Sequence, residues 1–328
     1  MVPDTLSAFD GIARELREVD RAISRAMDSD EEALSKIADH VVSSGGKRIR
    51  TALLLLAYMA ANGRAVKKVV PAAAAIEVIH TASLIHDDIS DKSAMRRGKP
   101  SAHVSFGVAR SLIAADYLMT AAFNLAGQFG LETIRTINHA CMQMAIGEIQ
   151  DLRHSADADL TKAKYIQIID RKTGSLIEAG VRIGVMLAGA PARAVDRFGT
   201  YGRNVGLAFQ IIDDTLDVSA TAGRLGKPVG KDLREGKVTL PVIIALERLE
   251  GKDRAFLREV VSARDGVPSQ AKVKRSLELI RSVEAEALSR KVARQYTKRA
   301  KRAIAGYPKT SHLKELNAFA DELVEREA

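Results

Sequence analysis

The sequence predicts an all-α protein, a bundle of amphipathic helices, and three observations support this fold class. Apolar residues recur every three or four positions through most of the 328 residues, which is the period of a helix that buries one face. No segment alternates strongly enough with the period of two that a half-buried strand requires. Proline is scarce, with 8 residues, whereas Ala, Leu, Glu, Lys and Arg are abundant and favour helix. Since an all-helical chain of this size can bury one large core, we expect a single domain over residues 1–328.

The hydrophobic pattern places the helices in order. Residues 6–27 carry apolar side chains at helical spacing. A second helix over residues 31–42 stops at a run of Ser and Gly, and a third passes through the four leucines at 53–56. Further helices are expected in the segment that Pro71 opens, at 104–127, 134–152, 165–190 and 198–216, and from Pro241 to the end of the chain.

Composition limits the classes of partner. The net charge of +9 favours anions, which include nucleic acid, anionic lipid and phosphorylated small molecules. Aromatic residues make up 4% and Trp is absent, so the stacking surfaces of a single-strand binder are not evident. We expect no nucleic-acid partner. The basic run from Lys291 to Arg302 is interpreted as a solvated helix face, with a transient membrane contact as the weaker alternative.

Cysteine content and hydropathy indicate the compartment. Cys141 is the only cysteine, which excludes an intrachain disulfide and argues against a cysteine-based zinc site. The first residues contain no apolar core of signal-peptide length. The longest apolar run, residues 52–61, is too short to span a bilayer. We therefore expect a cytoplasmic protein.

Two acidic clusters with the same spacing are the strongest signal in the chain. Each follows an apolar run and has its first and third carboxylates four residues apart, so a helix places both on one face. The clusters are Asp87, Asp88 and Asp91, and Asp213, Asp214 and Asp217. Carboxylates this crowded repel one another, and Mg²⁺ is the natural counterion because it takes oxygen ligands from one or two carboxylates and from phosphates. One such cluster alone would favour a solvated helix end; two predict a metal site.

Cationic segments accompany the clusters. Gly45 and Gly46 precede Lys47, Arg48 and Arg50 at the start of a helix, where glycine backbone and the positive helix end suit phosphate. In isolation an ordinary surface loop would be the more common explanation.

A second basic loop, residues 92–100, contains Arg96 and Arg97. Paired guanidinium groups suit phosphate, and neutralisation of Asp87 and Asp91 is compatible with that role.

Three further features share this pattern. His80 lies seven residues before Asp87 and so on the same helix face, with a ligand role and a packing role about equally favoured. Lys172 and Thr173 place a cation and a hydroxyl in an apolar helix, and a buried lysine needs an anionic partner. The Gly- and Lys-rich loop over residues 223–236 fits neither glycine-loop nucleotide motif, and we interpret it as a mobile flap that supplies cations.

In this order the motifs resemble those of the trans-prenyltransferases, the polyprenyl diphosphate synthases. The matching motifs are Gly45-Gly46-Lys47-Arg48-x-Arg50, Asp87-Asp88-x-x-Asp91 with Arg96-Arg97-Gly98-x-Pro100, Lys172-Thr173, Phe209-Gln210-x-x-Asp213-Asp214-x-x-Asp217 and Gly226-Lys227-Pro228-x-Gly230-Lys231-Asp232. The resemblance implies an isoprenoid synthase-type bundle around a deep central cavity, with the two Asp clusters facing across it, in a homodimer. Thr51 and Ser101 depart from the residues that are common in the family, and neither position has a ligand role.

The resemblance also implies roles for individual residues. About three Mg²⁺ ions would be held by carboxylates and would bridge the diphosphate of an allylic substrate; these ligands are Asp87, Asp91 and Asp213, with Asp88, Asp214 and Asp217 completing the catalytic clusters. That allylic diphosphate would contact Arg96, Lys172, Thr173, Gln210, Lys227 and Lys237. The diphosphate of isopentenyl diphosphate would contact Lys47, Arg50, His80 and Arg97.

The expected activity is the condensation of isopentenyl diphosphate with an allylic diphosphate. Ionisation of the allylic C–O bond gives a cation, and fixed positive charge stabilises the departing diphosphate. Ala82 and Ser83, just before the first Asp cluster, are small, and in this family that region lines the pocket for the growing chain. We therefore expect a product longer than farnesyl diphosphate, with Met119 and Phe123 as candidate floor residues.

Several alternatives stay open at this point. A short-chain farnesyl or geranylgeranyl diphosphate synthase differs only in product length, and a non-catalytic subunit would not need two complete Asp clusters. A terpene cyclase or head-to-head synthase would not need a second diphosphate site at Lys47, Arg50 and His80. A basic scaffold that binds nucleic acid is disfavoured for the same reason as the non-catalytic subunit, and a di-iron bundle because facing Glu-x-x-His pairs are missing.

Overall fold

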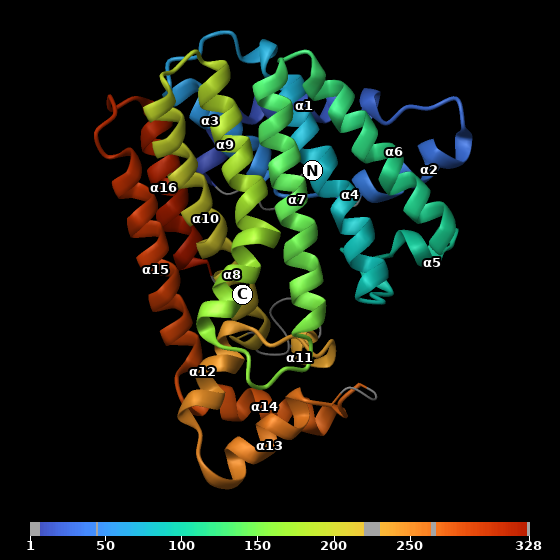
Figure 1. Cartoon of the computed structure of the whole chain (residues 1–328), viewed down its shortest axis with the longest axis vertical. Helices are drawn as coiled ribbons and strands as arrows, with labels where there is room; N and C mark the ends of the chain where they lie inside the picture. The colour runs from blue at the N-terminus through green and yellow to red at the C-terminus, as the bar shows by residue number, and fades with distance from the viewer. Residues whose placement is uncertain (1–6, 44, 220–229, 264–266, 327–328) are drawn as a thin grey trace. The chain divides into compact units, whose positions relative to one another are not determined.

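The structure, a computed structural model of the chain, describes residues 7–43, 45–219, 230–263 and 267–326 and is helical almost throughout (Figure 1). The prediction of an all-α fold is confirmed. The α-helices in chain order are α1 (Ala13–Ala26), α2 (Glu32–Val42), α3 (Ile49–Ala60), α4 (Val70–Ser90), α5 (Ala102–Phe106), α6 (Val108–Gly127), α7 (Leu131–Arg153), α8 (Lys162–Ile169), α9 (Ser175–Leu187), α10 (Ala192–Ser219), α11 (Lys231–Arg234), α12 (Leu240–Arg248), α13 (Gly251–Val261), α14 (Gln270–Ser282), α15 (Ala285–Ile304) and α16 (Ser311–Glu325). Short 3₁₀ turns occur at Ser7–Ile12 and Val66–Lys68, and Asp170–Gly174 is a π-helical turn.

The chain divides into two compact units. The first unit contains Met1–Cys141, Leu176–Gly202 and Gly306–Phe319. The second contains Met142–Ser175, Arg203–Ala305 and Ala320–Ala328. The single-domain organisation over residues 1–328 stays a prediction, and each unit is described by itself.

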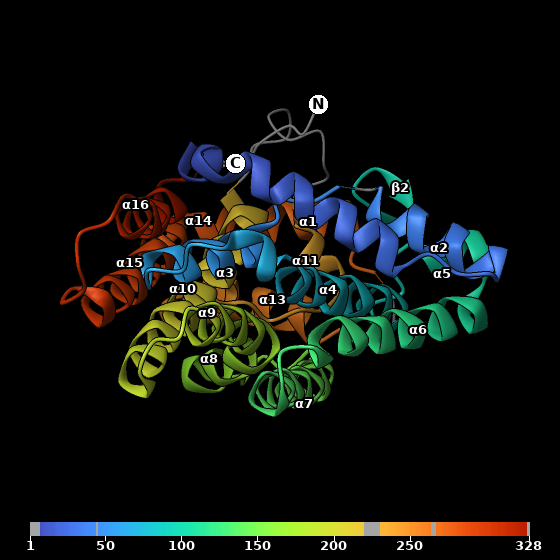
Figure 2. The ribbon, with the colours of Figure 1, turned by 90° about the horizontal axis from the view of Figure 1, so that it is seen from above.

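Helix α4 is the central element of the first unit. It packs against α6 along its length and also contacts α1 and α3 (Figures 1 and 2). Its Ala-rich first half is buried, and the four leucines of α3 at 53–56 are 0% exposed. Gly184 of α9 allows a close approach to α3, because a Cβ atom there would lie 2.3 Å from the carbonyl oxygen of Leu54. Burial of these apolar faces stabilises the first unit and fixes the orientation of α4 within it.

The second unit has α12 at its core. This helix contacts α8, α13, α14 and α15 (Figure 1). Its residues Leu240, Val242 and Ala245 are 0% exposed. Pro241 lies in the first turn of α12, where proline is tolerated because the first amides of a helix need no intrahelical acceptor.

Three details differ from the sequence prediction. The helix expected over 104–127 is broken at Gly107, whose φ of +85° separates α5 from α6. The basic loop 92–100 contains a pair of two-residue strands, β1 (Met95–Arg96) and β2 (Lys99–Pro100), in which Arg96 is opposite Lys99. The helix expected over 165–190 is interrupted by the π-helical turn and ends at Leu187.

The predicted flap is described only in part. Residues 220–229, which include Lys227 and half of the flap over residues 223–236, lie outside the described residues, whereas Lys231–Arg234 forms the one-turn helix α11. Among the helices that the structure describes, none combines the length and the apolar character needed to cross a membrane.

Candidate active site

The first Asp cluster lies at the end of α4. Asp87 is half-buried, and so is Asp91, which caps the helix with its amide donating to the carbonyl of Asp87 at 2.8 Å. Asp88 is only 4% exposed. The helical spacing places the first and third carboxylates on one face, as predicted, and both stay partly accessible. The burial of the middle carboxylate, Asp88, was not predicted.

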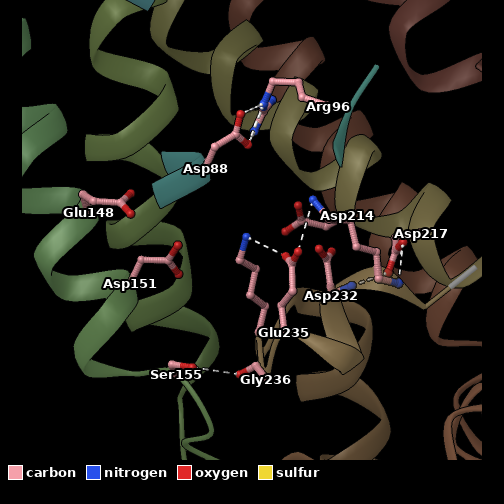
Figure 3. Close-up of polar contacts among 12 residues, drawn as sticks. Asp88, Arg96, Glu148, Asp151, Ser155, Asp214, Asp217, Asp232, Glu235 and Gly236 are labelled. Atoms are coloured by element: carbon pink, nitrogen blue, oxygen red, sulfur yellow. Dashed lines mark hydrogen bonds and ion pairs between the residues drawn. The ribbon is translucent and has the colours of Figure 1, made fainter. Parts of the chain in front are cut away.

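Asp88 is held by Arg96 of β1. The Nε of Arg96 donates to both carboxylate oxygens of Asp88 at 2.7 Å, and its Nη2 lies 2.7 Å from Oδ1 (Figure 3). The charges of Asp88, Asp87 and Asp91 together raise the pKa of Arg96 against the effect of its burial. Arg96, predicted to bind the allylic diphosphate, is thus paired with Asp88, whereas the sequence alternative named Asp87 and Asp91 as the carboxylates to be neutralised.

Positive charge gathers around His80 on the same helix. Burial lowers the pKa of the His80 imidazole well below its usual value, and nearby guanidinium groups lower it further. In decreasing order of effect these belong to Arg50, Arg97, Arg96 and Arg48. Arg97 also lies beside the glycine turn, since a Cβ on Gly46 would be 3.1 Å from its Nη1. A partly buried, neutral imidazole among arginines is a site suited to a multiply charged anion.

The second Asp cluster, on α10, repeats the pattern. Asp213 is exposed, Asp217 is half-buried and Asp214 is 7% exposed. Asp214 accepts hydrogen bonds from the Tyr165 hydroxyl at 2.6 Å and from Gln210 Nε2 at 2.7 Å. Burial raises the pKa of Asp214 to about 7, and these two donors oppose the rise.

The exposed carboxylate of this cluster has a basic neighbour. Asp213 Oδ1 lies 3.3 Å from Nη1 of Arg326. Arg290 donates to the carbonyls of Val324 and Arg326 and so ties down this end of the chain.

Asp217 is bonded to the backbone of the described part of the predicted flap. Its two carboxylate oxygens accept the amides of Lys231 and Asp232, each at 3.0 Å, at the start of α11 (Figure 3). Burial and the charges of Asp217 and Asp214 raise the pKa of Asp232 well above its usual value. Lys237, a predicted diphosphate ligand, lies 3.1 Å from Glu235.

Lys172 and Thr173 lie in the π-helical turn of the second unit. Lys172 Nζ is 2.5 Å from Glu148 Oε2 and 2.8 Å from Asp151 Oδ2, and both acids project from α7 (Figure 3). Thr173 donates to Gln210 at 2.8 Å. The anionic partner that the buried lysine required is therefore present, and π-turns of this kind often occur at functional sites.

Comparison with known proteins decides the family. The family model described as polyprenyl synthetase matches residues 31–280. The chain belongs to the polyprenyl synthetase family. It is a prenyltransferase with the all-α isoprenyl synthase fold.

Individual relatives agree with this assignment. The chain is 38% identical over 255 residues to the octaprenyl diphosphate synthase of Escherichia coli, covering 77% of this chain and 79% of the relative. It is 34% identical over 316 residues to the nonaprenyl diphosphate synthase of Mycobacterium tuberculosis, covering 96% and 92%. Among solved structures, a polyprenyl synthase from Caulobacter crescentus, complexed with calcium and isoprenyl diphosphate, matches with a TM-score of 0.93 and 33% identity, covering 100% of this chain and 99% of that chain.

The residues predicted to set product length belong to the first unit of this polyprenyl synthetase. Ala82 is 0% exposed on α4, and the neighbouring Ser83 donates its hydroxyl to the carbonyl of His80 at 2.9 Å. Met119 and Phe123 are half-buried on α6, the helix that packs against α4. Their roles in this polyprenyl synthetase stay predictions.

Several partners of the polyprenyl synthetase motifs were not found from the sequence. The Tyr165 hydroxyl on α8 donates to Asp214, 49 residues later in the chain, and Glu77 accepts hydrogen bonds from Arg48 and Thr51 at the start of α3. Glu148 and Asp151 carried a usable signal, because acids three residues apart on a helix share a face. Tyr165 carried none, since a single tyrosine in an apolar helix is most often a packing residue.

Proposed function

We propose that this polyprenyl synthetase is a chain-elongating, all-trans polyprenyl diphosphate synthase. It condenses isopentenyl diphosphate with an allylic diphosphate and makes a product longer than farnesyl diphosphate. The observation that carries the proposal is the repeated motif on α4 and α10, in which the outer carboxylates are accessible and the middle one is buried and bonded. The octaprenyl and nonaprenyl diphosphate synthases among the relatives support this activity and this range of products.

The arginine-rich environment of His80 is proposed to bind isopentenyl diphosphate. Lys47, Arg50 and Arg97 supply positive charge, and the lowered pKa of His80 leaves its imidazole neutral, able to donate one hydrogen bond. The guanidinium group of Arg97 lies against the Gly46 backbone, which supports a single anion site formed by the segment from Gly45 to Arg50 and the loop over residues 92–100. A diphosphate is the ligand that best matches this density of charge.

The second unit is proposed to contribute the allylic site. Lys172, Thr173 and Gln210 are already linked to acidic or amide partners, so they are oriented before a ligand arrives. Arg96, Lys227 and Lys237 complete the proposed set, with Lys227 outside the described residues.

Asp87, Asp91 and Asp213 are proposed as the residues that hold Mg²⁺. Their carboxylate oxygens are the ligand type that this ion prefers. Within residues 7–43, 45–219, 230–263 and 267–326 no group of three His, Cys, Asp or Glu side chains lies close enough together to hold a metal ion. In proteins Mg²⁺ usually takes one or two carboxylates and completes its shell with water and substrate phosphate. When bound, Mg²⁺ stabilises the negative charge of the departing diphosphate. The complex of the Caulobacter crescentus relative with calcium and isoprenyl diphosphate supports both ligand classes.

The chain's own residues then account for the remaining chemistry. In this proposal Arg96 and Lys172 stabilise the negative charge that develops on the leaving diphosphate. Lys47, Arg50 and Arg97 hold the second substrate by its diphosphate, which leaves its double bond available to attack the allylic cation. The released diphosphate is the expected proton acceptor.

A homodimer is part of the proposal. Val108, Leu112 and Ile113 at the start of α6 are 49%, 38% and 61% exposed. On α7, Met142 and Ile149 are 64% and 59% exposed and are seven residues apart, on one face. Exposed apolar stripes of this kind are typical of subunit interfaces, and sedimentation velocity of the purified chain tests the assignment.

Turnover with defined substrates tests the activity. The purified protein is incubated with Mg²⁺, isopentenyl diphosphate and farnesyl or geranylgeranyl diphosphate, and the products are sized by chromatography. We expect release of diphosphate and products longer than the primer. Absence of turnover with every allylic primer would overturn the proposal, and a product no longer than farnesyl diphosphate would leave the short-chain alternative in its place.

A further inference from the structure

Arg48 has an unusual backbone conformation for a residue with a side chain. Its φ of 50° and ψ of 31° lie in the left-handed region, which is strained for an L-residue because the Cβ atom comes too close to the following carbonyl oxygen. The residue is nevertheless the N-cap of α3, and its carbonyl accepts the amide of Ala52 at 2.9 Å. Such a conformation persists only where the surroundings hold it in place.

The side chain of Arg48 supplies that hold. Its Nε donates to Asp20 Oδ1 of α1 at 2.9 Å, and its Nη1 donates to Glu77 Oε1 of α4 at 3.1 Å. The guanidinium group thus joins the segment before α3 to two other helices of the first unit. The charges of Glu77 and Asp20 raise the pKa of Arg48 although burial acts to lower it.

Glu77 is buried and fully engaged in this arrangement. It is 5% exposed, and its second oxygen, Oε2, accepts the hydroxyl of Thr51 at 3.0 Å. The backbone carbonyl of Glu77 also accepts the hydroxyl of Thr81 at 2.9 Å. A buried carboxylate that contacts an arginine and a hydroxyl is a strong anchor, because loss of the arginine leaves a buried charge unpaired and loss of the hydroxyl leaves an acceptor without its donor.

Arg48 and Glu77 are close in the chain to residues of the proposed isopentenyl diphosphate site. Lys47 and Arg50 flank Arg48 in the chain, and His80 follows Glu77 by one turn of α4. Arg48 points to Asp20 and Glu77, whereas Arg97 lies against the Gly46 backbone.

We propose that Arg48 and Glu77 are positioning residues of the isopentenyl diphosphate site. Their ion pair fixes the segment from Gly45 to Arg50 so that Lys47 and Arg50 are presented to the diphosphate, and Arg48 itself is not a ligand. The inference rests on the proposed function of this site and adds to it the device that holds the site in shape.

Steady-state kinetics of Glu77→Gln distinguish positioning from direct binding. The substitution removes the charge but keeps the size and the hydrogen bond with Thr51. If Arg48 only positions the loop, the KM for isopentenyl diphosphate rises by about tenfold or more, while kcat and the KM for the allylic substrate change by less than about threefold. If Arg48 were a ligand restrained by Glu77, its release would lower the KM for isopentenyl diphosphate, and that result would overturn the proposal, as would an unchanged KM.

Substitutions of Arg48 complete the test. Arg48→Met is expected to give the same selective rise in KM, and Arg48→Lys a smaller one, because an ammonium group keeps the charge but cannot bridge two carboxylates in fixed geometry. The double variant Arg48→Met with Glu77→Met should be no worse than the poorer single variant, since the two residues act as a unit. Additive losses would contradict a shared role.

Arg182→Met is the matched control. Arg182 also pairs with two acids in the first unit, Asp196 at 2.8 Å and Glu178 at 3.7 Å, but outside the glycine turn. The Arg182→Met variant should leave the KM for isopentenyl diphosphate and the KM for the allylic substrate unchanged. If Arg182→Met and Glu77→Gln raised the KM for isopentenyl diphosphate equally, the rise would reflect a general loss of stability, and the proposal would be overturned. If Arg48→Met does not fold, the KM values of Glu77→Gln and Arg48→Lys for isopentenyl diphosphate decide between positioning and direct binding. An inactive wild type would instead refute the proposed function, so the two failures are distinguishable.

Discussion

The hydroxyl of Tyr165 donates a 2.6 Å hydrogen bond to Oδ2 of Asp214, and both side chains are buried. Tyr165 is on α8 and Asp214 on α10, both in the second unit. This contact, together with the bond from Gln210, orients the middle carboxylate of the second Asp cluster. The orientation of the Asp214 carboxylate therefore depends in part on Tyr165, a residue that no motif contains.

Tyr165→Phe is expected to lower kcat by about tenfold to a hundredfold. This is the usual effect of removing a hydrogen-bond donor that orients a side chain of the active site, here the carboxylate of Asp214. The free energy of unfolding should fall by about 1–3 kcal/mol, because a buried carboxylate oxygen loses its donor. The measurements are steady-state turnover and urea denaturation. Tyr201→Phe is the control, since the buried Tyr201 donates at 2.6 Å to the carbonyl of Leu316 in the first unit. The Tyr201→Phe variant should lose a similar free energy of unfolding but keep nearly the wild-type kcat. Equal losses of kcat in Tyr165→Phe and Tyr201→Phe would contradict the prediction.

The lowered pKa of His80 predicts that the free energy of unfolding depends on pH. Burial, followed by the charges of Arg50 and Arg97, lowers its pKa well below 6.5, so the folded state binds fewer protons at this site than the unfolded state. The stability that the neutral imidazole contributes is complete above the unfolded pKa and is lost as the pH falls through 6.5 toward the folded pKa, by at most about 1.4 kcal/mol per pH unit for one proton.

The measurement is the free energy of unfolding between about pH 8 and pH 5.5. His80→Asn should lose less stability on acidification than the wild type, because it removes the group that must stay neutral. His139→Asn, which removes an exposed histidine of α7, is the control for the loss of a histidine as such. The prediction is wrong if both variants flatten the pH dependence equally.

Local periodicity accounts for the parts of the site that the sequence predicted. The i, i+4 spacing of Asp87 and Asp91 requires one helix face, and the structure has the middle residue, Asp88, buried. The rule that a buried lysine needs an anion was used to predict a ligand role for Lys172; the structure has the side chain half-buried and paired with Glu148 and Asp151, and the ligand role stays a prediction.

What the sequence did not predict arises from long-range contacts and from backbone geometry. The Tyr165 to Asp214 bond joins residues 49 positions apart, and the left-handed Arg48 is stabilised by carboxylates from two other helices. The break at Gly107 was missed because the apolar pattern continues across it, and glycine alone does not reveal a positive φ. The π-helical turn at Asp170–Gly174 likewise has no periodicity of its own.

Gly147→Ala is expected to disturb this π-helical turn. A Cβ on Gly147 would lie 2.6 Å from the backbone nitrogen of Lys172 and 3.0 Å from the Cβ of Arg171, and backbone cannot move aside as a flexible side chain can. Overpacking of this kind costs about 1–3 kcal/mol. Since Lys172 would shift with the turn, kcat should fall as well.

Thermal unfolding and turnover of Gly127→Ala provide the comparison. Gly127 lies in α6, and a Cβ atom added there would meet no other atom within 4 Å, so alanine at this position should stabilise the helix by about 0.5–1 kcal/mol without affecting kcat. Wild-type kcat in Gly147→Ala would contradict a strict dependence of Lys172 on this close approach.

Product length should respond to substitutions on the facing helices α4 and α6. Ala82 is fully buried on α4, so the ring of Ala82→Phe must take up space now filled by its surroundings. If Ala82 borders the path of the growing chain, the added ring closes that path early, and the product becomes shorter. Phe123→Ala should have the opposite effect, because it removes the ring proposed as the floor.

Chromatographic sizing of the dephosphorylated products measures both effects. Leu125→Ala is the matched control: Leu125 is also half-buried on α6, but two residues along a helix place it on nearly the opposite side from Phe123. It should reduce stability without changing product length. A packing defect in the core would by itself slow turnover but leave the distribution of product lengths unchanged. Opposite shifts of product length in Ala82→Phe and Phe123→Ala would therefore assign both residues to the path of the growing chain. An unchanged distribution in Ala82→Phe would remove Ala82 from its wall.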